Sequence, residues 1–439
     1  MWRSFQAEGG LSSESNMASG KELIVKEASN FRDDGTQCVD FGGSTRSVLT
    51  NVVVGMLTGG TAIVAAGSYF AQPIAATIGR DLGLSSEMLG LIVTTSQMGY
   101  VFGLLFIAPL GDKLENRRLL FSMLCASVVA LSAAALAPDG AIFLAACFGI
   151  GISSISVQML VTMSAFMSDP ARRGQVVGCV TSGLLTGILL AWPAASFVSA
   201  RVGWRPLFAL DALVVSALAL ALRHFLPRRM PADSAPYAAM IGSLWKILRD
   251  TPELRRRAFR QALLFGGFSL FWTAAPFQLR SHFGLGEDGI ALFGLIGGSG
   301  ALIAPIAGRL ADVGRGRIVG LAGMAAVMAA FLLSVLVHDM WALCLAAVLI
   351  NAGVQSNHVV SQRTVLSLAP DAASRLNAIY IAIFFVGGAT GSASSMLLLQ
   401  FGWTGVGMVG CAAAALALGR GIALPSVPRV STLTPIWQS

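Results

Sequence analysis

Two short segments of the sequence each place an aspartate between a glycine and several cations. The aspartates, Asp112 and Asp312, lie 200 residues apart. A carboxylate at a helix end can accept hydrogen bonds from the exposed N-terminal amides of a neighbouring helix, and adjacent cations can pair with it. The segments therefore predict latches between helix ends, with ordinary loop charges as the alternative. Their residues are Gly111, Asp112, Lys113, Arg117, Arg118, Gly308, Asp312, Arg315 and Arg317.

The elements that carry these segments are predicted to be membrane-spanning helices. Hydrophobic residues make up 55% of the 439-residue chain and charged residues only 12%, about half the charged fraction of a soluble domain. The apolar runs approach the roughly 20 residues that a helix needs to cross a bilayer. They lack a period of two, which argues against a barrel. The lipid bilayer is therefore the predicted solvent for most of the chain.

Twelve such runs divide the chain into two sets of six. They cover residues 52–74, 88–110, 119–136, 141–167, 176–198, 207–226, 262–283, 290–310, 318–337, 341–368, 378–399 and 405–424. We expect a disordered tail at 1–45, a first six-helix bundle at 46–226, a linker at 227–258, a second bundle at 259–424 and a tail at 425–439. The fold class is all-α integral membrane, as two pseudo-symmetric bundles.

The distribution of Lys and Arg predicts the orientation. With both termini and the linker in the cytoplasm, 26 of the 30 basic residues lie inside, and only Arg80, Arg201, Arg205 and Arg280 lie outside. Positively charged loops resist translocation. The basic excess of +8 is thus explained by an inner-membrane topology with cytoplasmic termini, without nucleic-acid binding.

Several landmarks repeat at one offset. Gly203-Trp204 and Gly402-Trp403 are 199 residues apart, and Pro170 and Pro370 are 200 apart. A constant offset indicates a duplicated six-span unit, which places a substrate site between the halves near the bilayer midplane.

The aspartate segments resemble a known signature. Residues 109–118 read Pro-Leu-Gly-Asp-Lys-Leu-Glu-Asn-Arg-Arg, and residues 308–317 read Gly-Arg-Leu-Ala-Asp-Val-Gly-Arg-Gly-Arg. Both resemble the Gly-x-Leu-x-Asp-Arg-x-Gly-Arg-Arg pattern of the major facilitator superfamily. The first copy departs from it at Ala108, Glu115 and Asn116.

A finer resemblance points to the drug and metabolite efflux branch of that family. It rests on Tyr69-x-x-Gln72-Pro73 and on Gly99-Tyr100. The antiporter signature of helix 5 in that branch ends Gly-Pro-x-x-Gly-Gly, whereas this chain ends Trp-Pro-Ala-Ala-Ser at 192–196. The departure leaves the export direction open. Small residues in that helix allow close packing, and the candidates are Gly178, Gly183, Gly187 and Pro193.

The resemblance implies that helices 1, 4, 7 and 10 line a central cavity. Polar side chains within spans are costly unless they face such a cavity or bond to another helix. The candidate cavity residues are Tyr69, Gln72, Gln158, Trp272, Gln278, Asn351, Gln355 and Asn357. Trp272 ends an aromatic stripe with Phe265, Phe268 and Phe271 that could stack a flat substrate, although packing against lipid or helices is favoured.

Proton coupling needs a titratable group, and few are available. His358 is the candidate, with a structural hydrogen bond as the alternative. Asp211 lies near the outer end of its span, where we expect it to be solvated. The resemblance implies that related sequences often carry an acid around Asn351, and an amide there cannot shuttle a proton.

These features together predict a secondary active transporter for small amphipathic molecules, exporting them in exchange for protons by alternating access. An importer, symporter or facilitator on the same fold is the nearest alternative, and a non-transporting receptor or scaffold is a more distant one. We expect the protein to function as a monomer. We also expect no cofactor and no metal, because the six cysteines form no CxxC pair and no enzyme or nucleotide-binding motif appears.

Overall fold

The computed structural model of the chain describes residues 51–169, 172–228, 236–369 and 372–423, without the side chain of Asp112. The two expected tails, Pro170 and Pro370 lie outside this range. The first half contains α2 (Asn51–Tyr69), α3 (Ala75–Asp81), η1 (Ser86–Met88), α4 (Leu89–Phe102), η2 (Gly103–Ile107), η3 (Ala108–Asp112), α5 (Asn116–Ala135), α6 (Gly140–Ser153), α7 (Ile155–Met167), α8 (Arg173–Val202) and α9 (Trp204–Phe225).

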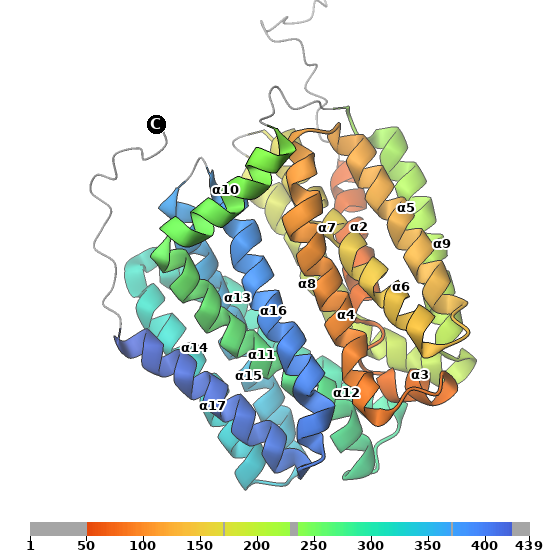
Figure 1. Cartoon of the computed structure of the whole chain (residues 1–439), viewed down its shortest axis with the longest axis vertical. Helices are drawn as coiled ribbons and strands as arrows, with labels where there is room; N and C mark the ends of the chain where they lie inside the picture. The colour runs from red at the N-terminus through yellow and green to blue at the C-terminus, as the bar shows by residue number, and fades with distance from the viewer. Residues whose placement is uncertain (1–50, 170–171, 229–235, 370–371, 424–439) are drawn as a thin grey trace, which may run out of the picture. The chain divides into compact units, whose positions relative to one another are not determined.

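After α10 (Tyr237–Asp250), the second half contains α11 (Pro252–Ser281), α12 (Glu287–Gly298), η4 (Ser299–Ile303), α13 (Ala304–Leu310), η5 (Ala311–Arg315), α14 (Gly316–Leu336), α15 (Met340–Leu368), α16 (Ala373–Leu399) and α17 (Gly402–Ala423). Figure 1 shows α2 to α9 on one side and α11 to α17 on the other. Helix α10 crosses one end, called here the linker end, and α3 lies at the opposite end, called the α3 end.

The number of spans agrees with the prediction. In the described part of the chain, eleven helical stretches are long and apolar enough to cross a membrane, and one of them, Glu287–Leu336, has 50 residues. A helix of that length would measure about 75 Å, more than twice the hydrocarbon thickness. It is interrupted at Val313 and Gly314, whose backbone angles are not helical. Counted as two spans, it completes the twelve and confirms the all-helical fold class.

One predicted boundary is wrong. The first span was expected to continue to residue 74, but α2 ends at Tyr69 and the chain turns before α3 begins at Ala75. Pro73 has no amide hydrogen and cannot continue the helical ladder, so Gln72 lies on a turn instead of on the helix.

The repeat is visible in the turns. Gly203 and Gly402 have φ of 86° and 74°, and the tryptophan after each one is buried. Gly83 and Gly284 form a second matching pair, both with φ of 65°. These left-handed angles favour glycine, so corresponding turns of the two halves adopt the same backbone conformation.

Glycines bring α8 and α2 into backbone contact. A Cβ added at Gly183 would lie 2.2 Å from the carbonyl oxygen of Thr58, and one at Gly187 would lie 2.1 Å from that of Ala62. Gly178 does not share this role, since a Cβ there would meet nothing within 4 Å. In the second half, Gly387 and Gly391 of α16 approach Ala262 and Gly266 of α11 in the same way.

We predict that Gly187→Ala lowers the apparent melting temperature of the detergent-solubilised protein. The new methyl group meets backbone that cannot rotate away, and such overpacking costs about 1–3 kcal/mol. Gly178→Ala is the matched control on the same helix and should be neutral or slightly stabilising, by up to ~1 kcal/mol. Equal melting temperatures for the two variants would contradict the packing described here.

Candidate functional site

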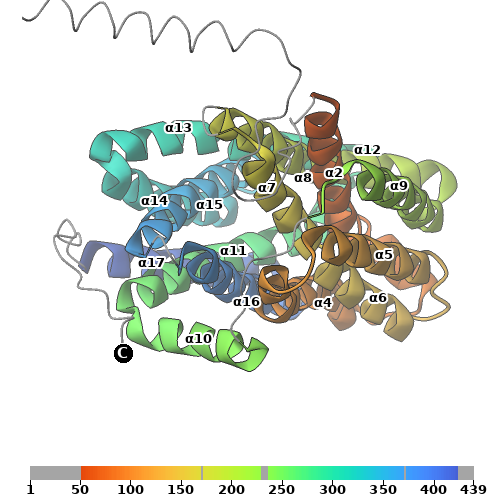
Figure 2. The same ribbon diagram turned by 90° about the horizontal axis from the view of Figure 1, so that it is seen from above.

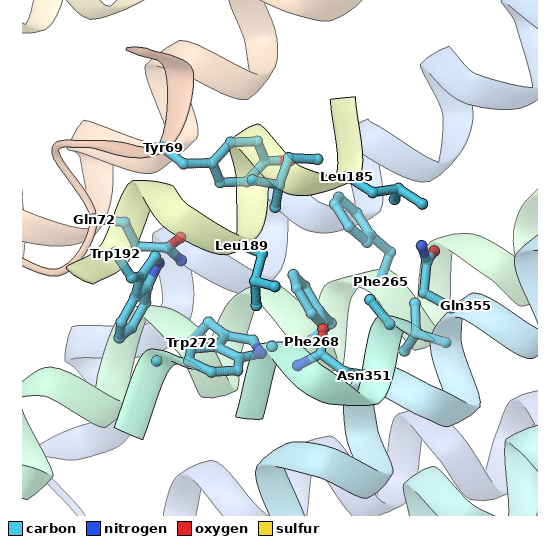
Figure 3. Close-up of a pocket in the computed structure, with 15 residues that line it drawn as sticks. Tyr69, Gln72, Leu185, Leu189, Trp192, Phe265, Phe268, Trp272, Asn351 and Gln355 are labelled. Carbon is cyan, nitrogen blue, oxygen red and sulfur yellow. The ribbon is translucent and has the colours of Figure 1, made fainter. Parts of the chain in front are cut away.

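A cavity of about 130 Å³ lies between the two halves of the described chain. Figure 3 shows its side chains converging from α2 and α8 of the first half and from α11 and α15 of the second. The lining residues are Tyr69, Gln72, Leu185, Ile188, Leu189, Trp192, Phe265, Phe268, Trp272, Gly294, Gly298, Ala301, Asn351, Val354 and Gln355. A site at the interface of the repeats is where alternating movement of the halves can act on a bound molecule.

Aromatic rings form one wall of this cavity. Trp192 of α8 packs edge-on against Trp272 of α11 with ring centroids 4.6 Å apart, and Phe265 and Phe268 stack at 5.3 Å. Two glycines of α12 make room for the tryptophans, because a Cβ at Gly294 would lie 2.7 Å from Trp192 and one at Gly297 would lie 2.6 Å from Trp272. Phe265 and Trp272 are buried in the protein and line the cavity together with Phe268. Phe271 is also buried and packs against Trp272 with ring centroids 5.8 Å apart, so it belongs to the packing between helices.

The polar groups of the cavity are neutral and mostly unpaired. Within the described chain, the side chains of Tyr69, Gln72 and Gln355 have no hydrogen-bond partner, and the buried Nε1 of Trp272 has none either. Asn351 donates from Nδ2 to the Ala347 carbonyl of its own helix at 3.2 Å. Among the described residues that line the cavity, none is charged. These groups offer hydrogen bonds to a ligand without fixing a formal charge.

The other predicted cavity residues lie elsewhere. Asn357 donates from Nδ2 to Oε1 of Gln261 at 2.6 Å inside the second half. Gln158 and Gln278 are half-buried and are not among the lining residues.

His358 is also not among the residues that line the cavity. Its Nδ1 lies 3.3 Å from the hydroxyl of Tyr380, and its ring stacks on that tyrosine at 5.7 Å. The structure thus gives His358 a bond within the second half.

The burial of Asp211 differs from the prediction. It was expected to be solvated, but it is buried between helices, with 7% of its surface exposed. Distance from the end of a span does not reveal which face of the helix a residue occupies, and Asp211 shares the buried face of α9 with Phe208 and Val215.

Polar contacts join the halves near the α3 end. Ser392 donates from Oγ to the Gly90 carbonyl at 2.9 Å, and Thr94 donates from Oγ1 to the Ala389 carbonyl at 3.2 Å. Gln97 donates from Nε2 to Oγ of Ser269 at 3.0 Å. Ser269 belongs to α11, and the other two bonds join α4 to α16, which lie side by side in Figure 2. These contacts close the α3 end of the seam between α4 and α16.

Two cations of the first aspartate segment contact other groups of the described chain. Arg117 donates to the Leu226 carbonyl at 3.2 Å, and Arg118 pairs with Glu115 at 2.9 Å. Glu115, where the signature has glycine, also lies 4.0 Å from Arg228. Gly111 and Lys113 flank the turn that leads to α5.

An ion pair and a hydrogen bond connect the second aspartate segment to α15. Asp312 forms an ion pair with Arg363, and the same guanidinium donates to the Gly308 carbonyl at 2.8 Å. Arg315 and Arg317 are exposed. Gly314, with φ of 81°, makes the turn. The aspartate therefore pairs with a cation from another helix and not with its own segment.

Sequence reasoning missed the contributions of α8 and α12 to the cavity. Leu185, Leu189 and Trp192 are apolar or aromatic residues in an apolar span, and Gly294 carries no side chain. Only Trp192 offers a signal, because an indole N–H in a span needs a partner or an aqueous cavity. Among the described residues, no group of three or more His, Cys, Asp and Glu side chains could hold a metal ion.

Comparison with known proteins gives concordant results. The family model described as Major Facilitator Superfamily matches residues 57–312 and 258–437. The chain is 35% identical over 373 residues to the uncharacterized transporter YgaY of Escherichia coli O157:H7, covering 84% of this chain and 95% of YgaY. It is 25% identical over 347 residues to a probable sugar efflux transporter of Helicobacter pylori strain G27, covering 78% and 87%.

Among solved structures, the human organic anion transporter MFSD10 (TETRAN) superposes with a TM-score of 0.64 at 18% identity, covering 84% of this chain and 98% of that one. At this identity the likeness concerns the fold alone. The family match spans both halves, and the cavity lies at the boundary between them. The chain therefore belongs to the major facilitator superfamily and is a multi-pass membrane transporter.

Proposed function

We propose that this transporter exports small, neutral or weakly cationic amphipathic compounds in exchange for protons. The observation that carries the proposal is the neutral, aromatic cavity shared by the two halves. A phosphorylated or strongly anionic substrate would need a basic partner there, and the lining supplies none. Rings and amides suit a flat molecule with a few hydrogen-bonding groups.

The direction of transport is proposed from two further observations. The basic residues gather at the linker end, which the positive-inside rule assigns to the cytoplasm, and the cross-half hydrogen bonds lie toward the α3 end. A transporter whose outer end is closed can bind its substrate from the cytoplasm, as an exporter must. The Helicobacter pylori relative, named a probable sugar efflux transporter, supports the same direction and adds sugars to the compounds to be tested.

Purified protein in proteoliposomes with an inside-acid interior tests this function. We expect addition of one of three probes, chloramphenicol, ethidium or isopropyl β-thiogalactoside, to release internal protons, reported by an encapsulated pH dye. Empty liposomes give the background. Proton movement in the same direction as the probe would establish a symporter instead. Probe entry without any proton movement would establish a facilitator.

We predict that Gln72→Leu raises the KM for the transported probe by about 2- to 10-fold, the value of one neutral hydrogen bond. The side chain keeps much of its size and loses only its amide. Gln158→Leu is the matched control, because Gln158 does not line the cavity, and its KM should equal that of the wild type. A rise in the control equal to that in Gln72→Leu would remove Gln72 from the site.

Closing the α3 end covalently should stop transport. The cysteines are placed at Thr94 and Ala389, in a background without the six native cysteines, because a hydrogen bond from Oγ1 of Thr94 to the Ala389 carbonyl joins the two helices there. Oxidation should reduce transport to the empty-liposome rate, and reduction should restore it, because alternating access requires this end to open. Either single cysteine alone should be insensitive to oxidant. Full activity of the cross-linked protein would exclude opening at this seam.

A further inference from the structure

Asp211 is the only Asp or Glu that is buried within the described residues. It lies seven residues after the start of α9, about 10 Å along the helix from the α3 end. It is not a cavity residue, and none of the helices that line the cavity carries it. Its presence inside the first half therefore calls for a role other than contact with substrate.

The carboxyl group of Asp211 lies against the backbone of α2 at Gly67. A Cβ added at Gly67 would lie 2.3 Å from Oδ2 of Asp211, and 3.8 Å from Cδ2 of Leu131 on α5. A side chain at position 67 would displace the carboxyl from this place. The contact therefore joins α9, α2 and α5 at one point.

No cation compensates this carboxyl in the described structure. Oδ2 is buried without a hydrogen-bond partner, and Asp211 belongs to none of the ion pairs formed by the described residues. Leaving an unpaired carboxylate in an apolar interior is costly. The neutral acid suits this place better than the anion, which would face apolar surface without a donor.

The other titratable groups on the packed helices do not supply a partner. Arg205 of α9 donates to the Ala137 carbonyl at 2.8 Å, and Arg201 of α8 donates to the Phe197 carbonyl at 3.2 Å. Asp81 of α3 accepts from Nε1 of Trp204 at 2.8 Å. The remaining groups on α2, α5, α6, α8 and α9 are Tyr69, Arg117, Arg118, Cys125, Cys147, Arg173, Cys179, Arg223 and His224.

Helix α2 connects this carboxyl to the cavity. Ser68, the residue after Gly67, shares a hydrogen bond of 2.6 Å with Ser154 at the junction of α6 and α7. Tyr69 and Gln72, which follow, both line the cavity. A change in the contact at Gly67 is thus transmitted through two to five residues of one chain segment to the binding surface.

We propose that Asp211 is a proton-binding site that couples proton exchange to the position of α2, and through it to the cavity. In the state described here the acid form rests against Gly67. Loss of the proton leaves a carboxylate that must move toward water or a donor, and α2 shifts with it. This inference rests on the proposed proton-coupled function, for which it names the proton carrier.

Two transport modes of the purified protein in proteoliposomes test the inference. Proton-driven accumulation of the active probe requires the carrier to bind and release protons, whereas probe counterflow at equal pH requires only movement of the halves. We expect Asp211→Asn, which imitates the acid form, to lose at least about tenfold in accumulation and to keep counterflow. Asp81→Asn, an exposed carboxyl at the same end, should keep both.

The outcomes separate the two proposals. If wild type accumulates no probe in response to protons but shows counterflow, proton coupling fails and Asp211 fails with it. If wild type accumulates the probe and Asp211→Asn does so equally, only the role of Asp211 is overturned.

A measurement on the wild-type protein guards against a variant that does not fold. Dicyclohexylcarbodiimide adds to a protonated carboxyl in apolar surroundings, giving an O-acylisourea that rearranges to an N-acylurea without a leaving group. Peptide mass spectrometry should find this label on Asp211, with a yield that falls as pH rises. Absence of label at every pH, or a yield independent of pH, would overturn proton exchange at this residue.

Discussion

The fold depends on how closely helix backbones approach one another in an apolar solvent. Lipid chains are as apolar as leucine, so burying apolar side chains between helices gives little driving force there, and van der Waals contact must replace it. The chain contains 49 glycines, and several stand where one helix meets the backbone of another. Gly183 and Gly187 do so between α8 and α2, and Gly387 and Gly391 do so between α16 and α11.

The same constraint shapes the boundary between the halves. Gly294 accommodates Trp192 from the opposite half, and Gly90 brings α4 against Ser392 of α16. Three hydrogen bonds across this boundary run from hydroxyls or an amide to backbone carbonyls or to another hydroxyl, and another runs from Oγ1 of Thr77 to the carboxylate of Glu287 at 3.2 Å. The three neutral bonds are worth about 0.6 kcal/mol each within membranes, so each of them is weak enough to be broken when the two halves separate.

Much of this architecture could be read from the sequence because the bilayer imposes it. Apolar length predicts spans, and the offset of about 200 residues predicts the repeat. For the cavity, Tyr69, Gln72, Trp272, Asn351 and Gln355 were identifiable because a polar or amphipathic side chain in a span must face something other than lipid. Which polar residue faces the cavity and which faces another helix depends on rotation about the helix axis. Asn357 and His358 are only a few residues from Gln355, yet they bond to Gln261 and Tyr380 inside the half.

The apolar residues that line the cavity could not be identified from the sequence in this way. Leu189 lines the cavity and Leu190 is exposed, although both are leucines of the same helix. Only the direction of the side chain differs. The position of Asp211 depends on a glycine in another helix, 144 residues earlier in the chain. Such pairings are set by tertiary packing and leave no trace in local composition.

The contact between Trp192 and Trp272 has an optical consequence. Their indole rings belong to different halves of the chain, with centroids 4.6 Å apart, and they line the cavity between the halves. Excited states of indoles in contact interact, and those of separated indoles do not. Separation of the halves at this point therefore alters the intrinsic ultraviolet emission, so the protein carries its own unlabelled reporter of conformational turnover.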